Sequence, residues 1–565
     1  MFNALDPLAV GPDDLLIRID DAMRLVQAMD YQQGQGWFDL QQYRLGSEDS
    51  HPMHWSRVVD APLALLISVF ESWADADHPV YAAAALWPVM CGVLIIGLYG
   101  LIGARLGGRM GLILIGLLTT LSVVTFFQPG RVDHHYVQSI LMLAMTALLI
   151  ARPGSTWHAA FAGALVCLSL GVGVSELPII IAASAVLALR WAFSLPDARN
   201  PAMGFFAALA LGAPFALLLT TPPGQWLVAW CDALSIVYLA GLVLGSAIVA
   251  TAAFLLPAAR APIARLGVLA VALGAAVAAA VSTNPDCLAG PYVDLDATTT
   301  EWISEREEVR GIREVIDQGD MRALFSLTVW PLVGIVGLLL AMMTAPAAQR
   351  FAWVLLGAMA IAGWVISLNQ IRGINSSLVF ATFGVMFLMI RAIAWRGMLN
   401  AIKPVMLVAL WFSQQPFAID LLVRQEPVSS EAGGGNISQI LAACTGDSQL
   451  APLAALSRGR VATSIEFGPF ILLRSDHWTL GSPHHRSYAG NRAAIEFNKA
   501  GERETYQILA DWQIDYVVTC DLFPFTVWSG VGASWLAERV DDDLPAWLEP
   551  TPSVAPARIF RFVPG

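Results

Sequence analysis

Charged side chains are scarce in this chain. Only 13% of its 565 residues are Asp, Glu, Lys or Arg, whereas 56% are hydrophobic, and the mean hydropathy is +0.61. This balance excludes an ordinary soluble protein. The basic residues stand singly, without the patches and interleaved aromatic residues of a nucleic-acid-binding surface, so we expect no nucleic acid among the partners.

Cysteine motifs and a recognisable signal peptide are not visible either. The six cysteines show no CxxC or other metal-ligand spacing, which argues against a structural zinc or redox site. Cys444 and Cys520 could form a disulfide if their region lies outside the cytoplasm, with two free thiols as the alternative. Residues 1–16 lack the basic segment that opens a signal peptide.

Long apolar runs dominate the middle of the chain. A helix needs roughly 20 apolar residues to cross a bilayer. About twelve runs approach or exceed this length, at residues 80–104, 110–127, 136–151, 157–173, 176–193, 203–221, 234–257, 264–282, 323–343, 350–368, 373–391 and 402–422. We therefore predict a polytopic α-helical membrane protein. About sixty polar residues before the first run are expected on the outer side of the membrane, yet no evident segment would carry them across it. We therefore expect a further helix upstream, which would make thirteen spans.

The short connections between the runs predict the orientation. Alternate connections hold nearly all of the arginines, whereas the others hold only Arg131 and Arg372. By the positive-inside rule the arginine-rich connections are cytoplasmic, so we predict a multi-pass protein of the bacterial inner membrane whose other face is periplasmic.

Three parts follow from this orientation. Residues 1–79 form a first periplasmic loop with an interfacial helix, and residues 80–424 form a transmembrane domain with a long periplasmic loop at 283–322. Residues 425–565 have the composition of a soluble domain and alternate strand-like and helical stretches, including a helix expected over 491–512. The pattern predicts a periplasmic α/β domain.

The stretch QPGRVDHHY at residues 128–136 is the first candidate for chemistry. It places Arg131, Asp133, His134 and His135 where a span reaches the periplasmic face, and ionisable groups at a bilayer boundary are costly enough to suggest function. A carboxylate and a neutral imidazole both bind divalent cations and can act as general bases. An arginine is suited to a phosphate. Hydrogen bonding at the membrane surface without further role is the alternative.

A second acidic motif lies far away in sequence but on the same side. Asp20 and Asp21 open a helix that continues to Arg24. Acidic residues at a helix start are favoured by the helix dipole, so a purely structural role is the alternative. Together the two motifs match a sugar-phosphate donor: one acid deprotonates the acceptor, while a cation and an arginine offset charge on the departing phosphate.

The order of these features resembles the GT-C superfamily, integral membrane glycosyltransferases that use polyprenyl-phosphate-linked sugars. The resemblance spans the whole chain and is distant but nearest to the catalytic subunits of oligosaccharyltransferases. It implies that Asp20 or Asp21 is the catalytic base and that Asp133 shares the catalytic site. The second-loop Asp-x-Asp motif of those subunits corresponds here to Asp133 and His135, with His in place of the second acid.

The resemblance also implies a metal site. Its ligands would be Asp21, Asp133 and His135, together with Glu305 of the long loop, and the cation would be Mn²⁺ or Mg²⁺. Glu301 and Glu307 are alternatives to Glu305. We do not find the tryptophan-rich acceptor motif of oligosaccharyltransferases, so transfer of a whole oligosaccharide to asparagine is not supported.

The remaining candidates concern substrate and phosphate binding. We expect contributions from Arg24, Arg131, His134, Arg372 and Glu176. The alternative for Arg372 is a simple interfacial anchor, and the alternative for Glu176 is a role in helix capping or helix packing. The loop at 476–487 contains three histidines and an arginine. These side chains could bind a metal or an anionic substrate; the alternative is a surface loop that docks on the membrane domain.

We therefore predict transfer of a sugar, hexose or pentose, from a polyprenyl-phosphate carrier to a lipid A, polysaccharide or protein acceptor. The alternatives are a lipid-linked glycan transporter or flippase, and a non-catalytic subunit of a glycan-assembly complex. Transporters usually show internal repeats and charges within spans, and neither is evident here.

Overall fold

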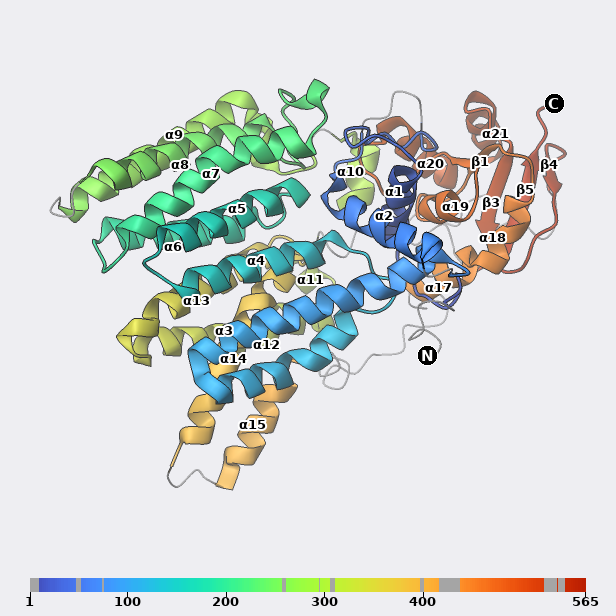
Figure 1. The fold of residues 1–565 in the computed structure, drawn as a ribbon. Helices are drawn as coiled ribbons and strands as arrows, with labels where there is room; N and C mark the ends of the chain where they lie inside the picture. The colour runs from blue at the N-terminus through green and yellow to red at the C-terminus, as the bar shows by residue number, and fades with distance from the viewer. Residues whose placement is uncertain are drawn as a thin grey trace.

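The computed structural model describes residues 10–46, 52–73, 76–256, 261–293, 295–304, 310–396, 401–415, 437–522, 536 and 544–565. In these ranges a bundle of long helices carries a mixed α/β domain at one end, with two N-terminal helices between them (Figure 1).

The bundle consists of apolar helices. They are α3 (Pro79–Phe126), α4 (His134–Ala151), α5 (Thr156–Val172), α6 (Leu177–Ala192), α7 (Arg199–Thr220), α8 (Ile236–Leu255), α9 (Pro262–Thr283), α12 (Met321–Thr344), α13 (Ala347–Ser367), α14 (Gly373–Ala394) and α15 (Lys403–Phe412). Eight described helices are long and apolar enough to cross a membrane, and α5, α6 and α15 are shorter apolar helices. The predicted polytopic architecture is confirmed.

The long helix α3 is two helices joined at Gly108. This residue has φ 60°, a left-handed conformation that favours glycine. Beyond it the chain folds back so closely that a Cβ on Gly111 would lie 2.2 Å from the carbonyl oxygen of Gly103. The sequence had predicted two spans here, separated at residues 105–109. With α3 counted as its two halves, the apolar helices of the described residues match the twelve predicted runs.

Shorter elements gather at one end of the bundle. They are α1 (Ile19–Gln32), α2 (Arg57–Ser72), the 3₁₀ turns η2 (Pro223–Gln225) and η3 (Pro285–Ala289), α10 (Ala297–Ser304) and α11 (Ile312–Asp317). Helix α1 packs on α2 and on α19 of the C-terminal domain, and α10 packs on α20. The first loop, the long loop and the C-terminal domain, which the arginine distribution assigned to one side of the membrane, therefore meet at one end of the helix bundle (Figure 1).

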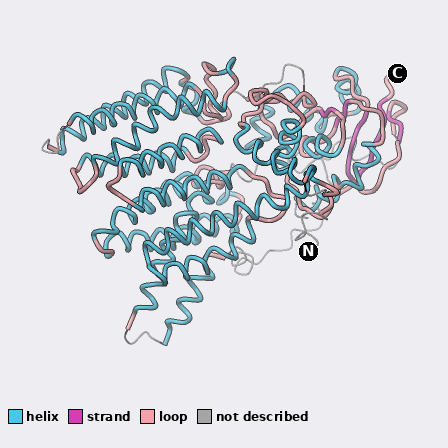
Figure 2. The backbone as a smooth tube through the Cα atoms, in the orientation of Figure 1, coloured by secondary structure: helices cyan, strands magenta, loops and turns pink. Residues whose placement is uncertain are grey.

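The C-terminal domain is built on a five-stranded sheet of order β2-β1-β3-β5-β4. Its strands are β1 (Arg460–Ala462), β2 (Trp478–Thr479), β3 (Tyr516–Cys520), β4 (Leu548–Pro550) and β5 (Ala557–Phe562). Strand β1 pairs in parallel with β2 and β3, whereas β5 pairs antiparallel with β3 and β4. Figure 2 shows that the strands are confined to this domain. The predicted α/β class is confirmed.

The domain's described helices are α17 (Ile437–Thr445), α18 (Asp447–Ala454), α19 (Gly468–Arg474), α20 (Tyr488–Lys499) and α21 (Glu502–Asp511). The single helix expected over 491–512 was wrong. Ala500 and Gly501 are extended, and Gly501 caps the start of α21, so the helix breaks there.

Two disulfides brace the described chain. Cys444–Cys520 joins α17 to β3, which is the pairing that the sequence left open. Cys231–Cys287, which the sequence analysis missed, joins the loop before α8 to η3.

The first loop and the C-terminal domain share a seam. The Thr479 N–H donates to the Arg44 carbonyl, and the Gly46 N–H donates to the Thr479 carbonyl, which adds a bridge at the β2 edge of the sheet. The Arg44 guanidinium donates to the carbonyls of Leu472 and Ser475 at the end of α19. Helix α1 is thus held against the C-terminal domain as well as against α2.

Candidate active site

The two acidic motifs meet through Asp21. Its carboxylate is only 1% exposed. Oδ1 accepts a hydrogen bond from the Val132 N–H at 2.8 Å, and Oδ2 lies 2.8 Å from Arg131 Nε. Because Arg131 and Val132 belong to the loop that leads into α4, the fold joins the first predicted loop directly to the second.

Asp133 organises the second motif. As the N-cap of α4 its carboxylate accepts the His135 N–H at 3.0 Å, a favourable use of a carboxylate at a helix start. Arg131 Nη2 lies 3.4 Å from one carboxylate oxygen, and His134 Nδ1 lies 3.3 Å from the other. Arg131 therefore touches both acids.

The two carboxylates have opposite electrostatic settings. Burial raises the pKa of Asp21 to about 7, even though the Arg131 charge opposes this shift. Burial would also raise the pKa of Asp133, but the neighbouring imidazoles of His135 and His134, the Arg131 guanidinium and the hydrogen bond from the His135 N–H outweigh it and hold that pKa well below the usual range. One acid thus exchanges its proton near neutral pH while its neighbour stays ionised, a division found in acid–base sites.

The sequence resemblance implies a divalent cation, and two of the four predicted ligands, Asp133 and His135, lie in a group that fits one; its third member, His134, was not among the predicted ligands. The ligand atoms of Asp133, His134 and His135 lie within 4.8 Å of one another, and one carboxylate with two imidazoles suits a transition metal. The Asp21 oxygens are engaged by Arg131 and Val132 instead. Glu305 lies outside the described residues, so its role and that of Asp21 as ligands stay predictions.

Arg24 is held inside the protein. Its Nη1 lies 2.8 Å from Asp60 of α2, and both side chains are at most 3% exposed. Its guanidinium also lies 4.2 Å from the centre of the Trp55 ring. This pairing braces α1 against α2, and phosphate binding by Arg24 stays a prediction.

The other predicted residues surround this centre. Asp20 is exposed and borders a small hollow together with His54 and His484. Glu176 is buried and accepts a hydrogen bond from Ser376 Oγ at 2.7 Å, which links the start of α6 to α14.

Arg372, just before α14, points toward the long loop. Its Nε donates to Gln370 Oε1 at 3.0 Å, and its Nη1 donates to the Tyr292 hydroxyl at 3.4 Å. The Tyr292 ring in turn lies 5.4 Å from the His485 ring of the C-terminal domain. Arg372 thus reaches the same end of the molecule as the acidic motifs.

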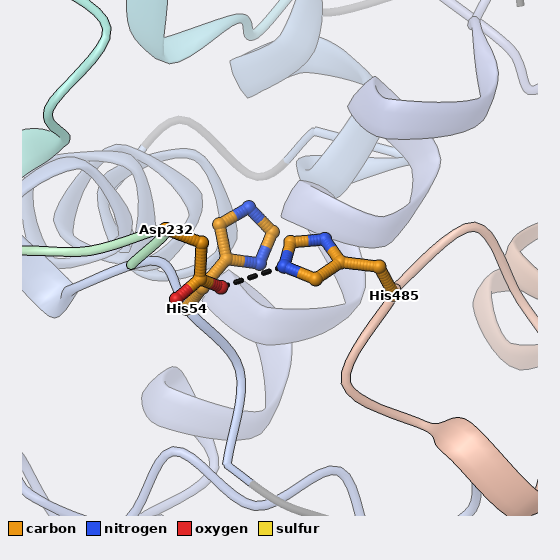
Figure 3. A group of neighbouring side chains, drawn as sticks. All are labelled: His54, Asp232 and His485. Carbon is orange, nitrogen blue, oxygen red and sulfur yellow. Dashed lines mark hydrogen bonds and ion pairs between the residues drawn. The ribbon is translucent and has the colours of Figure 1, made fainter. Parts of the chain in front are cut away.

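Sequence reasoning missed three residues of the site wall. The Trp55 ring lies 5.7 Å from the His134 ring, the adjacent His54 ring lies 4.4 Å from that of His485, and His485 contacts Asp232 (Figure 3). Two signals could have found them. The first loop carries the aromatic stretch HPMHW, and Asp232 is the only charged residue of 222–235.

The fold is shared with an archaeal oligosaccharyltransferase, an enzyme of the kind that the sequence resemblance pointed to. Three solved structures of the Archaeoglobus fulgidus oligosaccharyltransferase superpose on the whole of this chain. The enzyme AglB in complex with an inhibitory peptide and a dolichol-phosphate aligns at TM-score 0.64 and 16% identity over 72% of its length. The apo form aligns at TM-score 0.59 and 15% identity over 72%, and the complex with Zn and sulfate at 0.59 and 14% over 71%. No family model matches the chain, and no curated protein does. The predicted GT-C architecture is therefore confirmed as a fold.

Proposed function

We propose that this protein is a membrane glycosyltransferase that moves a sugar from a polyprenyl-phosphate carrier to an acceptor at the periplasmic face of a bacterial inner membrane. The observation that carries this proposal is the convergence of Asp21 with Arg131 and Asp133 at one end of the helix bundle. Supporting it is a fold shared with an oligosaccharyltransferase that was solved with a dolichol-phosphate and a peptide.

Asp21 acts as the general base of the reaction. The acceptor hydroxyl or amine attacks the anomeric carbon of the donor sugar, and its proton passes to the Asp21 carboxylate. The bond between that carbon and the phosphate oxygen breaks, and the polyprenyl phosphate leaves with the electron pair. A carboxylate whose pKa is about 7 is well matched to this task, since a general base works best near the operating pH.

Arg131, Asp133, His134 and His135 serve the departing phosphate. Arg131 supplies directed donors for phosphate oxygens, and Asp133 holds Arg131 and the start of α4 in place. Asp133 and the two histidines would hold a divalent cation, which supplies positive charge beside the phosphate when it is bound. Arg372 adds a second guanidinium at the same end of the bundle, and the apolar helices accommodate the prenyl tail.

The test is sugar transfer in membranes that carry polyprenyl-phosphate-linked hexose or pentose, offered lipid A, polysaccharide and protein acceptors in parallel. Asp21→Asn and Asp133→Asn each keep the side-chain size and remove one charge. Loss of the general base is expected to lower the rate by about 10²- to 10⁴-fold. Asp511→Asn changes an exposed carboxylate of α21 and is the matched control.

Chelation of divalent cations tests the second part of the proposal. We expect it to lower transfer by wild type, and added Mn²⁺ or Mg²⁺ to restore it. If both active-site variants transfer sugar as fast as Asp511→Asn, the catalytic proposal fails. A non-catalytic subunit, or a transporter of lipid-linked glycans, is then the better account.

A further inference from the structure

The loop between α7 and α8 presents one carboxylate from a rigid support. Asp232 follows Cys231, whose disulfide to Cys287 ties this loop to η3. The Tyr238 hydroxyl donates to the Cys231 carbonyl, and Ser235 Oγ donates to the Trp230 carbonyl at 2.5 Å. The Asp232 side chain is 8% exposed. A buried carboxylate on a cross-linked loop has little freedom to move.

Two consecutive residues of the C-terminal domain engage this carboxylate. Arg486 approaches it with two nitrogens, Nη2 at 2.6 Å from Oδ1 and Nε at 2.8 Å from Oδ2, while its guanidinium lies 4.1 Å from the centre of the Trp230 ring. His485 Nε2 lies 2.6 Å from Oδ2. Burial alone would raise the pKa of Asp232, but the hydrogen bonds from His485 and Arg486 lower it well below the usual range. The contact is a two-pronged ion pair between domains, a geometrically specific interaction.

Ring contacts connect the ion pair to the active site through His54 and Trp55. The ring of His485 packs on that of His54, and the ring of the next residue, Trp55, contacts both the His134 ring and the Arg24 guanidinium. Figure 3 shows His54, Asp232 and His485 converging from three separate segments of the chain. A change at Asp232 can therefore reach His134 through packed rings.

We propose that Asp232 is a positioning residue for the transfer reaction: it anchors the C-terminal loop 482–487 against His54 and Trp55, and so fixes His134 beside Asp133. The inference rests on the proposed function. It makes the C-terminal domain a structural part of the catalytic unit, although Asp232 itself does not touch the reacting groups.

The same residues could be read as a metal site, because ligand atoms of His54, Asp232 and His485 lie within 4.8 Å of one another. The ion pair is favoured over this reading. Arg486 already engages both carboxylate oxygens, and a cation placed there would stand close to a buried guanidinium of the same sign.

The experiment compares Asp232→Asn with Asp286→Asn in the full-length protein. Asp286 is an exposed carboxylate beside the other half-cystine of the same disulfide, so it is a close control. We expect hydrogen exchange of the amides in 482–487 to quicken at least tenfold in Asp232→Asn alone. The kcat for sugar transfer should fall roughly a hundredfold, the scale of a misplaced active-site group, and the KM for the donor should change little.

Arg486→Gln and the double variant with Asp232→Asn provide the second arm. If the two residues act as one anchor, each single change loses about the same kcat, and the double variant loses no more than either. Additive losses, or unchanged exchange in 482–487, would overturn the anchor. Purified wild type and Asp232→Asn should carry the same amount of bound zinc and manganese, and loss of one equivalent in the variant would overturn the ion-pair assignment.

The two levels of the proposal fail in different ways. If wild type transfers no sugar to any acceptor offered, the proposed function fails, and hydrogen exchange alone decides whether Asp232 anchors the domain. If wild type is active and Asp232→Asn is equally active with protected amides, only the anchor fails.

Discussion

The pH dependence of sugar transfer should report the ion pair between Asp21 and Arg131. The Asp21 carboxylate must be ionised to accept a proton from the acceptor. Because burial raises the pKa of Asp21 to about 7, kcat/KM for sugar transfer should rise with pH through about 7. Replacing Arg131 by Gln removes a positive charge at 2.8 Å. The protonated form of Asp21 is then favoured further, and the midpoint should move to higher pH.

The size of this shift follows from the geometry. An opposite charge within a few ångströms lowers a carboxylate pKa by about 1–3 units, so its loss should raise the midpoint from about 7 to about 8–10. At pH 7 the ionised fraction would fall from about one half to about one tenth or less. The position of the midpoint is informative even if Arg131 also binds phosphate, because a weaker donor site lowers the whole profile without moving it.

The assay is the initial rate of sugar transfer at subsaturating donor between pH 5 and about 10, for wild type, Arg131→Gln and Arg131→Lys. The lysine variant keeps the charge and should keep its midpoint within about one unit of wild type. A profile for Arg131→Gln that rises at the same pH as wild type would refute the assignment of Asp21 as the titrating base.

Three further predictions concern stability. Asp60→Asn leaves two arginines buried without their shared carboxylate and should lower the free energy of unfolding by about 3–5 kcal/mol. Replacing Cys444 and Cys520 together by serine should lower the stability of the C-terminal domain by about 2–4 kcal/mol in chemical denaturation. Gly384→Ala places a Cβ 1.9 Å from a backbone oxygen of α12 and should cost about 1–3 kcal/mol, whereas Gly274→Ala meets no atom within 4 Å and should be neutral or stabilising by up to about 1 kcal/mol.

Each of these has a comparison that can contradict it. Asp77→Asn removes an exposed carboxylate near the start of α3, and equal unfolding curves for it and Asp60→Asn would argue against a buried ion pair. A stable Cys444→Ser/Cys520→Ser variant would show that the cross-link adds nothing to the fold. Equal thermal stability of the two alanine variants would contradict the close approach of α12 and α14.

Much of the architecture was predictable because membrane spans and their orientation are local properties. Apolar runs and the arginines between them placed Asp21 and Asp133 on one side before any contact was known. Boundaries inside the C-terminal domain were harder. The break at Gly501 was missed because the residues on both sides favour a helix. The extended backbone of Ala500 and Gly501 alone separates α20 from α21.

The sequence by itself determined that this chain is a polytopic helical membrane protein with an α/β domain after its spans, and it predicted that the two acidic motifs lie on one face. Only the tertiary structure decided their partners. It pairs Asp21 with Arg131, commits Arg24 to Asp60, and joins Asp232 to Arg486. Hydropathy and charge bias are properties of short contiguous segments and can be read from the sequence. A buried ion pair depends on how distant segments pack together.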